Sequence, residues 1–329
     1  MRSEKFGQNC RRRSMLVCVL VGATALRTVA QPDRQVAITI DDLPAGNAKF
    51  MSGAEIADMN SRLLAKLREQ RIPAVGFVNE SKLYKLGEVD ERIKALAMWL
   101  DSGFELGNHT FAHTSLNQAG LKAFEEDVIQ GEVVTGWLAA QHKMKLRYFR
   151  HPYLDTGRDL ETRREAEAFL IARGYRIAPV TVDAWDWMYG RVYEDAREHG
   201  DAALEKELLK DYLEYTDTMF AYAERLSKEL VGYELKQILL LHANQLEADH
   251  LHELAAVIRR RGYRFINLAE ALSDQAYSLP DTYIGEEGTD WLDHWAITRG
   301  KPAQGHPVFP AWVIERDKAI SRPASAPAP

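Results

Sequence analysis

The 329-residue chain has only two cysteines, Cys10 and Cys18, and both lie close to its N-terminus. If that segment is removed, neither disulfide bonds nor thiol chemistry is possible, and about 300 residues must be held by a hydrophobic core, which is feasible at that size. The chain also lacks internal repeats and any apolar run long enough for a mature transmembrane anchor. With 46% apolar and 27% charged residues and a mean hydropathy of −0.34, it is neither collagen-like, nor wholly disordered, nor a polytopic membrane protein.

Residues 1–30 have the pattern of an export signal peptide. Arg11–Arg13 is a basic region, Met15–Leu26 is an apolar run, and Thr28–Ala30 is a small-residue cleavage site. The pattern favours general secretory export, with twin-arginine export as the alternative because of the paired arginines. We therefore expect an exported protein, periplasmic or secreted, without a stable membrane anchor.

A basic surface is also missing. Without residues 1–30, 36 basic and 47 acidic residues remain, which gives a net charge of −11. Nucleic acids and anionic membranes need a positively charged surface, so both are disfavoured as partners. Neutral or cationic ligands fit better, and nothing in the sequence specifies an oligomeric state.

From Val36 onward the chain alternates short apolar strands with amphipathic helical segments. This pattern predicts an α/β fold, a single (β/α) barrel with about seven parallel strands. The expected strands are Val36–Ile40, Ala74–Val78, Phe104–Gly107, Leu146–Phe149, Ile177–Val182, Gln237–Leu241 and Arg264–Asn267.

The barrel is expected over residues 31–273, with a long solvated helical insertion at about residues 191–232. Residues 274–313 contain three tryptophans and are expected to pack on the barrel as an extension. The remaining residues, 314–329, are expected to be largely disordered, because proline, alanine and serine dominate their end.

Five polar clusters fall at or just after the ends of expected strands, where barrels build their active sites. They are Thr39–Asp42, His109–His113, Arg150–Tyr153, Asp183–Trp187 and Leu239–His242.

Two of these clusters suggest a metal site. The adjacent Asp41 and Asp42 are expected to point to opposite faces of the strand, so one can bind a metal while the other takes a proton. His109 and His113 are spaced to share one helical face and reach one cation. With Asp42 they form a His₂Asp set that leaves positions open for water and substrate, which is typical of catalytic sites. The non-functional alternatives are that the aspartate pair caps a turn and that the two histidines share a surface by coincidence.

The other clusters suggest substrate contacts. Trp185 and Trp187 can stack on sugar rings, while the interleaved Asp183 and Asp186 bind hydroxyls or orient a base. The alternative is a tryptophan-rich packing corner. Taken alone, the Arg150–Tyr153 cluster indicates the end of a strand that is stopped by proline. His242 taken alone indicates a core histidine whose hydrogen bonds are satisfied.

Together, in this order, the five clusters resemble the motifs of the polysaccharide deacetylase (NodB-homology) family, carbohydrate esterase family 4, from about Val36 to Leu272. The resemblance implies a distorted (β/α) barrel that binds a divalent metal, zinc with cobalt or nickel as alternatives, and removes acetyl groups from carbohydrate. The sequence departs from the family pattern at Leu43, where glycine is common, and at Leu154, where a small residue is common.

The resemblance also implies roles. Three residues would bind the metal, namely Asp42, His109 and His113. Asp41 would be the general base, held in place by Arg150. His242 would be the general acid, oriented by the Asp186 carboxylate. The roles toward the substrate are the backbone N–H of Tyr153 as oxyanion donor, Leu240 and Trp187 as walls of the acetyl pocket, and Trp185 and Asp183 as further contacts.

Three alternatives remain open for the function. These are an O-acetyl xylan esterase, a ureide or cyclic imide hydrolase on the same barrel, and a non-catalytic carbohydrate-binding protein. Five other histidines are expected to be solvated, namely His142, His250, His252, His294 and His306.

Overall fold

The computed structural model describes residue 1, residues 33–302 and residues 304–320. The expected signal peptide and both cysteines lie outside the described residues. In the described part of the chain, eight strands form one sheet, in which every pairing between strands is parallel. They are β1 (Arg34–Leu43), β2 (Ala74–Val78), β3 (Glu105–Asn108), β4 (Tyr148–Phe149), β5 (Arg176–Ile177), β6 (Val182–Asp183), β7 (Gln237–His242) and β8 (Tyr263–Ile266).

The sheet curves into a distorted barrel. Its strands follow the order β5-β4-β3-β2-β1-β7-β6, with β8 paired to the first half of β1. A flat sheet of seven strands would separate its edges by roughly 29 Å. However, only residues 178–181 link the two edge strands, and the five residue steps from Ile177 to Val182 span at most roughly 17 Å. The edges must therefore approach each other, which confirms the expected α/β barrel.

This closure corrects one predicted strand. The segment Ile177–Val182 was expected to be a single strand, but β5 pairs with β4 and β6 pairs with β7 at the opposite edge. The residues between them cross the gap, where the Ala178 N–H donates to Phe149 and the Thr181 N–H donates to Ile238. The run is mostly apolar because the crossing is buried, not because it is one strand.

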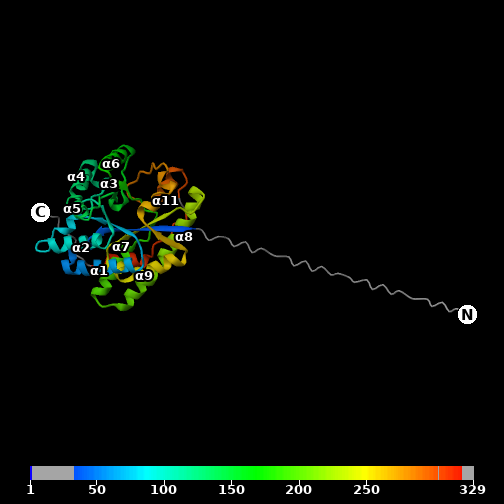
Figure 1. The fold of residues 1–329 in the computed structure, drawn as a ribbon, viewed down its shortest axis with the longest axis horizontal. Helices are drawn as coiled ribbons and strands as arrows, with labels where there is room; N and C mark the ends of the chain where they lie inside the picture. The colour runs from blue at the N-terminus through cyan, green and yellow to red at the C-terminus, as the bar shows by residue number, and fades with distance from the viewer. Residues whose placement is uncertain (2–32, 303, 321–329) are drawn as a thin grey trace. The chain divides into compact units, whose positions relative to one another are not determined.

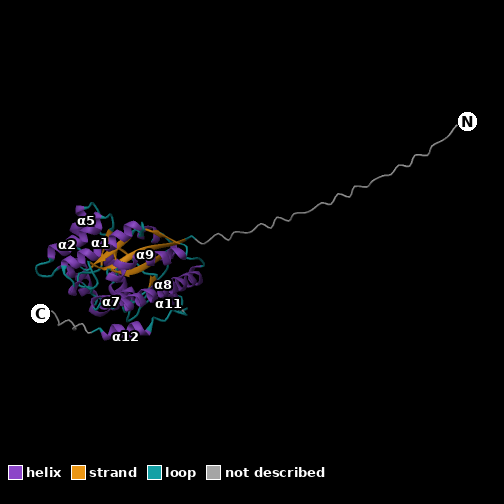
Figure 2. Ribbon diagram, turned by 90° about the horizontal axis from the view of Figure 1, so that it is seen from below, coloured by secondary structure: helices purple, strands orange, loops and turns teal. Residues whose placement is uncertain are grey.

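Helices surround the strands (Figures 1 and 2). The α-helices are α1 (Gly53–Glu69), α2 (Val89–Asp101), α3 (Leu116–Ala119), α4 (Leu121–Gln130), α5 (Val133–Gln141), α6 (Leu160–Ala172), α7 (Asp186–Glu198), α8 (Ala202–Val231), α9 (Gln245–Arg260), α10 (Leu268–Ala271), α11 (Trp291–Thr298) and α12 (Ala311–Ala319). Short 3-10 helices are η1 (Ala48–Phe50), η2 (Glu80–Leu83), η3 (Pro152–Leu154) and η4 (Gln275–Ser278).

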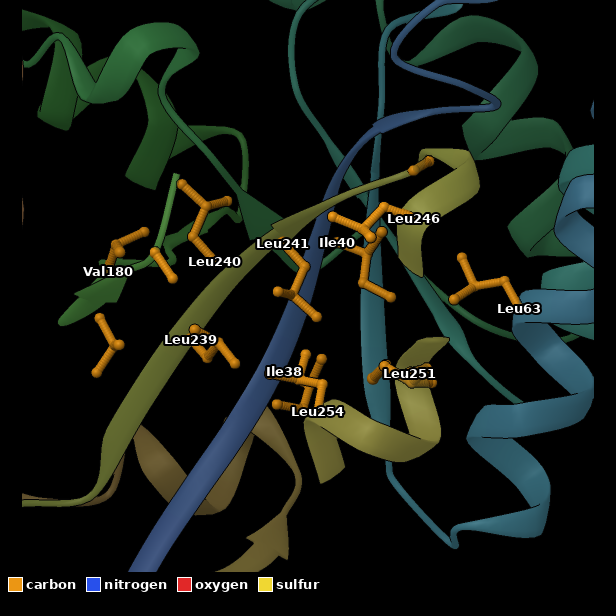
Figure 3. Packing of buried hydrophobic residues seen from close by; sticks show 14 of the residues in the cluster. Ile38, Ile40, Leu63, Val180, Leu239, Leu240, Leu241, Leu246, Leu251 and Leu254 are labelled. Carbon is orange, nitrogen blue, oxygen red and sulfur yellow. The ribbon is translucent and has the colours of Figure 1, made fainter. Parts of the chain in front are cut away.

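Strand alternation divides the core into two layers. Along β1, Ile38 and Ile40 pack outward among leucines of α9 and Leu63 of α1 (Figure 3). Ala37 belongs to a separate inner cluster with Phe77 of β2 and Ile238 of β7. Because side chains alternate with a period of two, the residues after Ala37 on this inner face are Thr39 and Asp41. The alternation therefore aims polar residues at the carboxyl end of the barrel.

The insertion is not a solvated helix. The expected segment 191–232 forms most of α7 and all of α8, and the long helix α8 buries one side. Its Leu208, Tyr212 and Phe220 are at most 1% exposed. The charged residues that suggested solvation occupy the other side of an amphipathic helix.

The C-terminal extension packs on the barrel. Trp295 and Leu292 of α11 are at most 2% exposed, and the Trp291 N–H donates to Val180 in the crossing segment. Order also continues past the expected boundary at Val313, because α12 ends at Ala319. Residues 321–329 lie outside the described part. Across residues 33–302 and 304–320, no helix has the length and apolar character needed to cross a membrane.

Candidate active site

The carboxyl ends of the strands open into a cavity of about 560 Å³. Ten of the twelve site residues expected from the sequence line it: Asp41, Asp42, His109, His113, Tyr153, Asp183, Trp185, Trp187, Leu240 and His242. The other two, Arg150 and Asp186, are fully buried and contact Asp41 and His242. The strand register explains part of this convergence, since Asp41 of β1 pairs with His242 of β7 and Thr39 pairs with Leu240.

The two aspartates do not point to opposite faces as expected. The register of β1 against β2 shifts between Ile40 and Leu43, and Asp42 adopts a left-handed backbone with φ of 72°. This irregularity interrupts the strand alternation, so both carboxylates reach the same cavity. Leu43 then turns into the core, where it is fully buried.

Asp42, His109 and His113 form a candidate metal site. One donor atom from each lies within 4.8 Å of the others, and His113 Nε2 is 3.7 Å from Asp42 Oδ1. The Nδ1 of His109 donates to the Arg150 carbonyl at 2.8 Å, which leaves its Nε2 free to bind a metal. Burial lowers the pKa of His109 and lowers that of His113 to about 4, so both imidazoles are neutral, as ligands must be. The donor set therefore fits a divalent cation such as zinc.

The predicted reason for this histidine pairing is wrong. Residues 109–113 form no helix; they are a loop in which Thr110 and His113 have φ values of 63° and 60°. The loop nevertheless brings the two imidazole rings to 4.7 Å. The spacing of four residues identified the pair, but left-handed turns provide the geometry.

Lys82 is a site residue that the sequence did not reveal. Its Nζ lies 2.8 Å from Asp42 Oδ1, and it comes from η2, directly after the carboxyl end of β2. Burial opposes ionisation of Asp42, but Lys82 and then the neighbouring imidazoles hold its pKa well below the usual value. A carboxylate offers about four lone-pair positions, so the ammonium and a metal can share it. The sequence did contain a signal for this residue, because a run of polar residues, 79–82, directly follows an expected strand.

Asp41 is 2% exposed and is held by Arg150. The guanidinium Nη1 lies 3.5 Å from Asp41 Oδ2, while Nη2 donates to the Thr39 hydroxyl at 2.8 Å. Burial raises the pKa of Asp41 to about 6, against the opposing charge of Arg150. A carboxylate in this condition is ionised at neutral pH and still basic enough to accept a proton.

His242 lines the same cavity and is paired with the buried Asp186. The His242 Nδ1 donates to Asp186 Oδ1 at 2.8 Å, and both the His242 backbone N–H and the Asn244 amide donate to Oδ2. Burial alone would lower the pKa of His242, but the Asp186 carboxylate raises it to about 9. The imidazole is therefore protonated at neutral pH, and Nε2 is the ring nitrogen that can donate a proton to a ligand.

The tryptophan pair combines packing with cavity lining. Trp185 and Trp187 stack at 6.1 Å, and Trp185 also stacks at 4.9 Å on Phe309 of the extension. Asp183 accepts the Trp185 backbone N–H at 2.8 Å, so this carboxylate fixes the turn before α7. The packing-corner interpretation is thus correct for one indole face, while both indoles still line the cavity.

Backbone strain concentrates around the cavity. Among the described residues, eight non-glycines have positive φ. Five of them belong to the polar clusters and a sixth directly follows one: Asp42, Thr110, His113, Tyr153, Trp185 and then Leu154. Such residues cost roughly 1–3 kcal/mol each and persist where the surroundings enforce them, often at functional sites. Sequence patterns did not indicate this feature, since none of the six is glycine or asparagine.

The extension supplies one wall of the cavity. Residues 286–290 and His306 line it, and His306 is exposed, as expected for a solvated histidine. His294 was also expected to be solvated, but it is fully buried, and its Nδ1 hydrogen-bonds to Asp281 at 2.9 Å. His151 is 1% exposed and lines the cavity as well.

Comparison with solved structures gives the same fold. A mutant of a pseudoenzyme of carbohydrate esterase family 4, restored to enzymatic activity, superposes with a TM-score of 0.50 at 18% identity, covering 74% of this chain and 69% of the other. A family 4 carbohydrate esterase from Streptomyces lividans covers 71% and 92% at 18% identity, with a TM-score of 0.45. A peptidoglycan deacetylase from Bacillus subtilis covers 74% and 92% at 17% identity, with a TM-score of 0.47.

The chain matches no curated protein in sequence. The match to a family model concerns a shorter part of the chain. The sequence model of the family described as polysaccharide deacetylase matches residues 28–169, a range that includes the Asp41–Asp42, His109–His113 and Arg150–Tyr153 clusters. The resemblance to the polysaccharide deacetylase family is therefore confirmed, with this match carrying three of the five clusters.

Proposed function

We propose that the protein is a metal-dependent hydrolase that removes acetyl groups from an N-acetylated carbohydrate of the chitooligosaccharide or peptidoglycan type. The observation that carries this proposal is that two chemical units meet in one cavity. Asp42, His109 and His113 line it as a candidate metal-donor set, and His242, paired with Asp186, lines the same cavity.

A cation held by Asp42, His109 and His113 would supply Lewis acidity, which lowers the pKa of water and polarises an acyl carbonyl. Zinc suits two imidazoles and one carboxylate, with cobalt or nickel as alternatives. The protein side chains supply the remaining steps.

Asp41, held by Arg150, accepts a proton from the attacking water as its oxygen bonds to the acetyl carbon. The backbone N–H of Tyr153 donates to the carbonyl oxygen as negative charge develops there, where fixed donors stabilise a transition state most. His242 donates its proton to the departing nitrogen as the carbon–nitrogen bond breaks, which leaves acetate and a free amine. Asp186 keeps that imidazole protonated and oriented.

The carbohydrate is proposed from the walls of the cavity. Trp187 and Leu240 border the acetyl group, and Trp185 with Asp183 offers a ring face and a carboxylate to a sugar. An exported location agrees with acetylated polymers outside the cytoplasm. A mature N-terminus immediately after Ala30, measured by mass spectrometry of protein from the native host, would support export.

The test is acetate release before and after metal removal. Protein stripped with a chelator, and verified as metal-free by elemental analysis, should lose release of acetate from N-acetylglucosamine oligomers and regain it with zinc, cobalt or nickel. An unchanged circular dichroism spectrum shows that stripping leaves the fold intact. Full turnover in the metal-free sample contradicts the proposal.

The same assay separates the alternatives. Acetate from acetylated xylan alone would keep the mechanism and change the substrate to an ester. Ammonia from a ureide, with no acetate from any sugar, would move the protein out of the deacetylases. Binding of sugar without turnover in the metal-loaded protein would indicate a carbohydrate-binding protein, a relevant outcome because one structural relative is described as a mutated pseudoenzyme.

A further inference from the structure

The C-terminal extension contacts the turn that carries Tyr153. The Gly288 N–H donates to Asp155 Oδ1 at 2.8 Å, immediately after the turn. Asn117 donates its amide to the carbonyls of Gly285 and Glu286 at 3.1 and 3.2 Å. These bonds tie residues 285–288 to the short helix α3 and to the segment that follows the Tyr153 turn.

The turn itself is strained. Tyr153 and Leu154 are consecutive and have φ values of 58° and 59°, which neither side chain favours. The cost is roughly 1–2 kcal/mol for each residue, so the neighbouring structure must enforce the conformation. Within the turn, the Leu154 and Asp155 N–H groups donate to His151 and Pro152.

Gly288 lies directly against the backbone of this turn. A Cβ added to it would lie 2.3 Å from the Tyr153 carbonyl oxygen and 2.3 Å from the Leu154 carbonyl carbon. Real Cβ atoms do not approach backbone atoms so closely, so only glycine allows this packing. Position 288 requires glycine for lack of space, because the atoms it contacts belong to the main chain and cannot move aside by changing rotamer.

The turn also contacts the candidate metal site. The Tyr153 ring lies edge-on to the His113 ring at 4.3 Å, and both residues line the cavity. A displacement of the turn would therefore move both the Tyr153 N–H and the ring that supports His113.

We infer that residues 285–288 of the extension form a positioning clamp, in which Gly288 and Asp155 hold the Tyr153–Leu154 turn so that its N–H group can act on the acyl oxygen. The inference rests on the proposed function for its catalytic consequence. The clamp itself is a structural claim that can be measured without any substrate.

The first measurement is hydrogen–deuterium exchange of a peptide covering residues 151–157. Gly288→Ala forces the backbones apart, and Asp155→Ala removes the acceptor, so exchange in this peptide should become about tenfold faster in both variants. Gly136→Ala in α5 is the matched control, since an added Cβ would meet only Leu146 at 3.9 Å. Unchanged exchange in both clamp variants overturns the clamp.

The second measurement is steady-state kinetics on the substrate identified in the wild-type protein. A displaced oxyanion donor weakens the transition state more than substrate binding, so kcat should fall about 10- to 100-fold while KM changes less than about threefold. Asp155→Asn keeps an oxygen that can accept the Gly288 N–H and should recover most of kcat. Gly136→Ala should match the wild type.

The outcomes separate the two proposals. A wild-type protein that releases no acetate from any sugar contradicts the proposed function and removes the catalytic part of the inference, while the exchange data still decide the clamp. If the wild type is active and Gly288→Ala exchanges faster with an unchanged kcat, the positioning role is wrong and the function stands.

Discussion

Asp41 and Asp42 are adjacent in the chain but differ in their partners. Arg150 lies beside Asp41, whereas Lys82 and His113 lie beside Asp42. We predict that Asp41→Asn keeps the metal and loses roughly 10²- to 10⁴-fold in turnover, as expected for a general base. Asp42→Asn should bind zinc at least about tenfold more weakly, because it removes a charged ligand.

Titration calorimetry with zinc, combined with acetate release, checks this pair. Asp58→Asn, an exposed carboxylate on α1, is the control and should resemble the wild type in both measurements. Tight zinc binding by Asp42→Asn with loss of binding by Asp41→Asn would show that the two roles are reversed.

Lys82 contacts Asp42 Oδ1, the carboxylate oxygen that also lies 3.7 Å from His113 Nε2. Its positive charge would repel a dication held by the same carboxylate, so removing it should strengthen metal binding. We predict that Lys82→Met lowers the zinc dissociation constant about three- to tenfold. Weaker binding would mean that Lys82 orients Asp42 more than it competes for it.

The pH dependence of turnover should report His242. Its pKa is raised to about 9 by Asp186, so the acid form predominates at neutral pH and is lost as the pH rises through about 9. We predict an alkaline fall in kcat/KM near that pH. Asp186→Asn removes the charge that favours the imidazolium, so the fall should begin at lower pH, by at least about one unit. An unshifted alkaline limb in Asp186→Asn would exclude His242 as the group that titrates.

The motif residues could be predicted because each follows a recognisable strand in the chain. Lys82 and Gly288 could not be predicted in the same way. Lys82 reaches Asp42 of β1 from η2, the 3-10 helix that follows β2. Gly288 contacts Asp155, from which it is separated by more than 130 residues in the chain. Neither contact leaves a local pattern.

At the scale of elements, periodicity predicted most strands but not how the barrel closes. The run Ile177–Val182 is mostly apolar because the crossing between β5 and β6 is buried, and a buried strand has the same composition. Helix α8 was misjudged for a related reason, because its charged side is as prominent in the sequence as its buried tyrosines.

The extension depends on α11 for its attachment. Trp295 is 2% exposed within the main core cluster and packs edge-on against Tyr277. We predict that Trp295→Ala lowers the free energy of unfolding by about 3–5 kcal/mol, the usual cost of removing a buried aromatic ring. Chemical denaturation measures this, with Trp137→Ala as the control, since Trp137 is 57% exposed. A loss below about 1 kcal/mol would mean that α11 is only loosely attached.

At the scale of the whole molecule, segments far apart in the chain line one cavity. The strand β1 supplies the aspartates, and residues 286–290, which precede α11, supply part of its wall. The sequence match ends at residue 169, so this wall lies outside the part that resembles the family in sequence.

The charge of that wall leads to a prediction about the substrate. Two exposed glutamates of this wall, Glu286 and Glu287, line the cavity, and no lysine or arginine does so among the described residues. Together with a net charge of −11 after removal of residues 1–30, these carboxylates should repel anionic substrates. We predict that kcat/KM is higher for neutral N-acetylglucosamine oligomers than for muropeptides that have the same number of sugars but carry carboxylates. The difference should shrink as salt screens the charges.

A double variant tests whether the wall causes this preference. Glu286→Gln with Glu287→Gln should reduce the preference for neutral oligomers about three- to tenfold at low salt and have little effect at high salt, because exposed charges act through a screened field. Glu161→Gln with Glu165→Gln, two exposed positions on α6, changes the net charge equally and is the matched control. If the control pair has the same effect, overall charge and not the wall determines the preference. A wild type that prefers the anionic muropeptide at low salt would contradict the prediction itself.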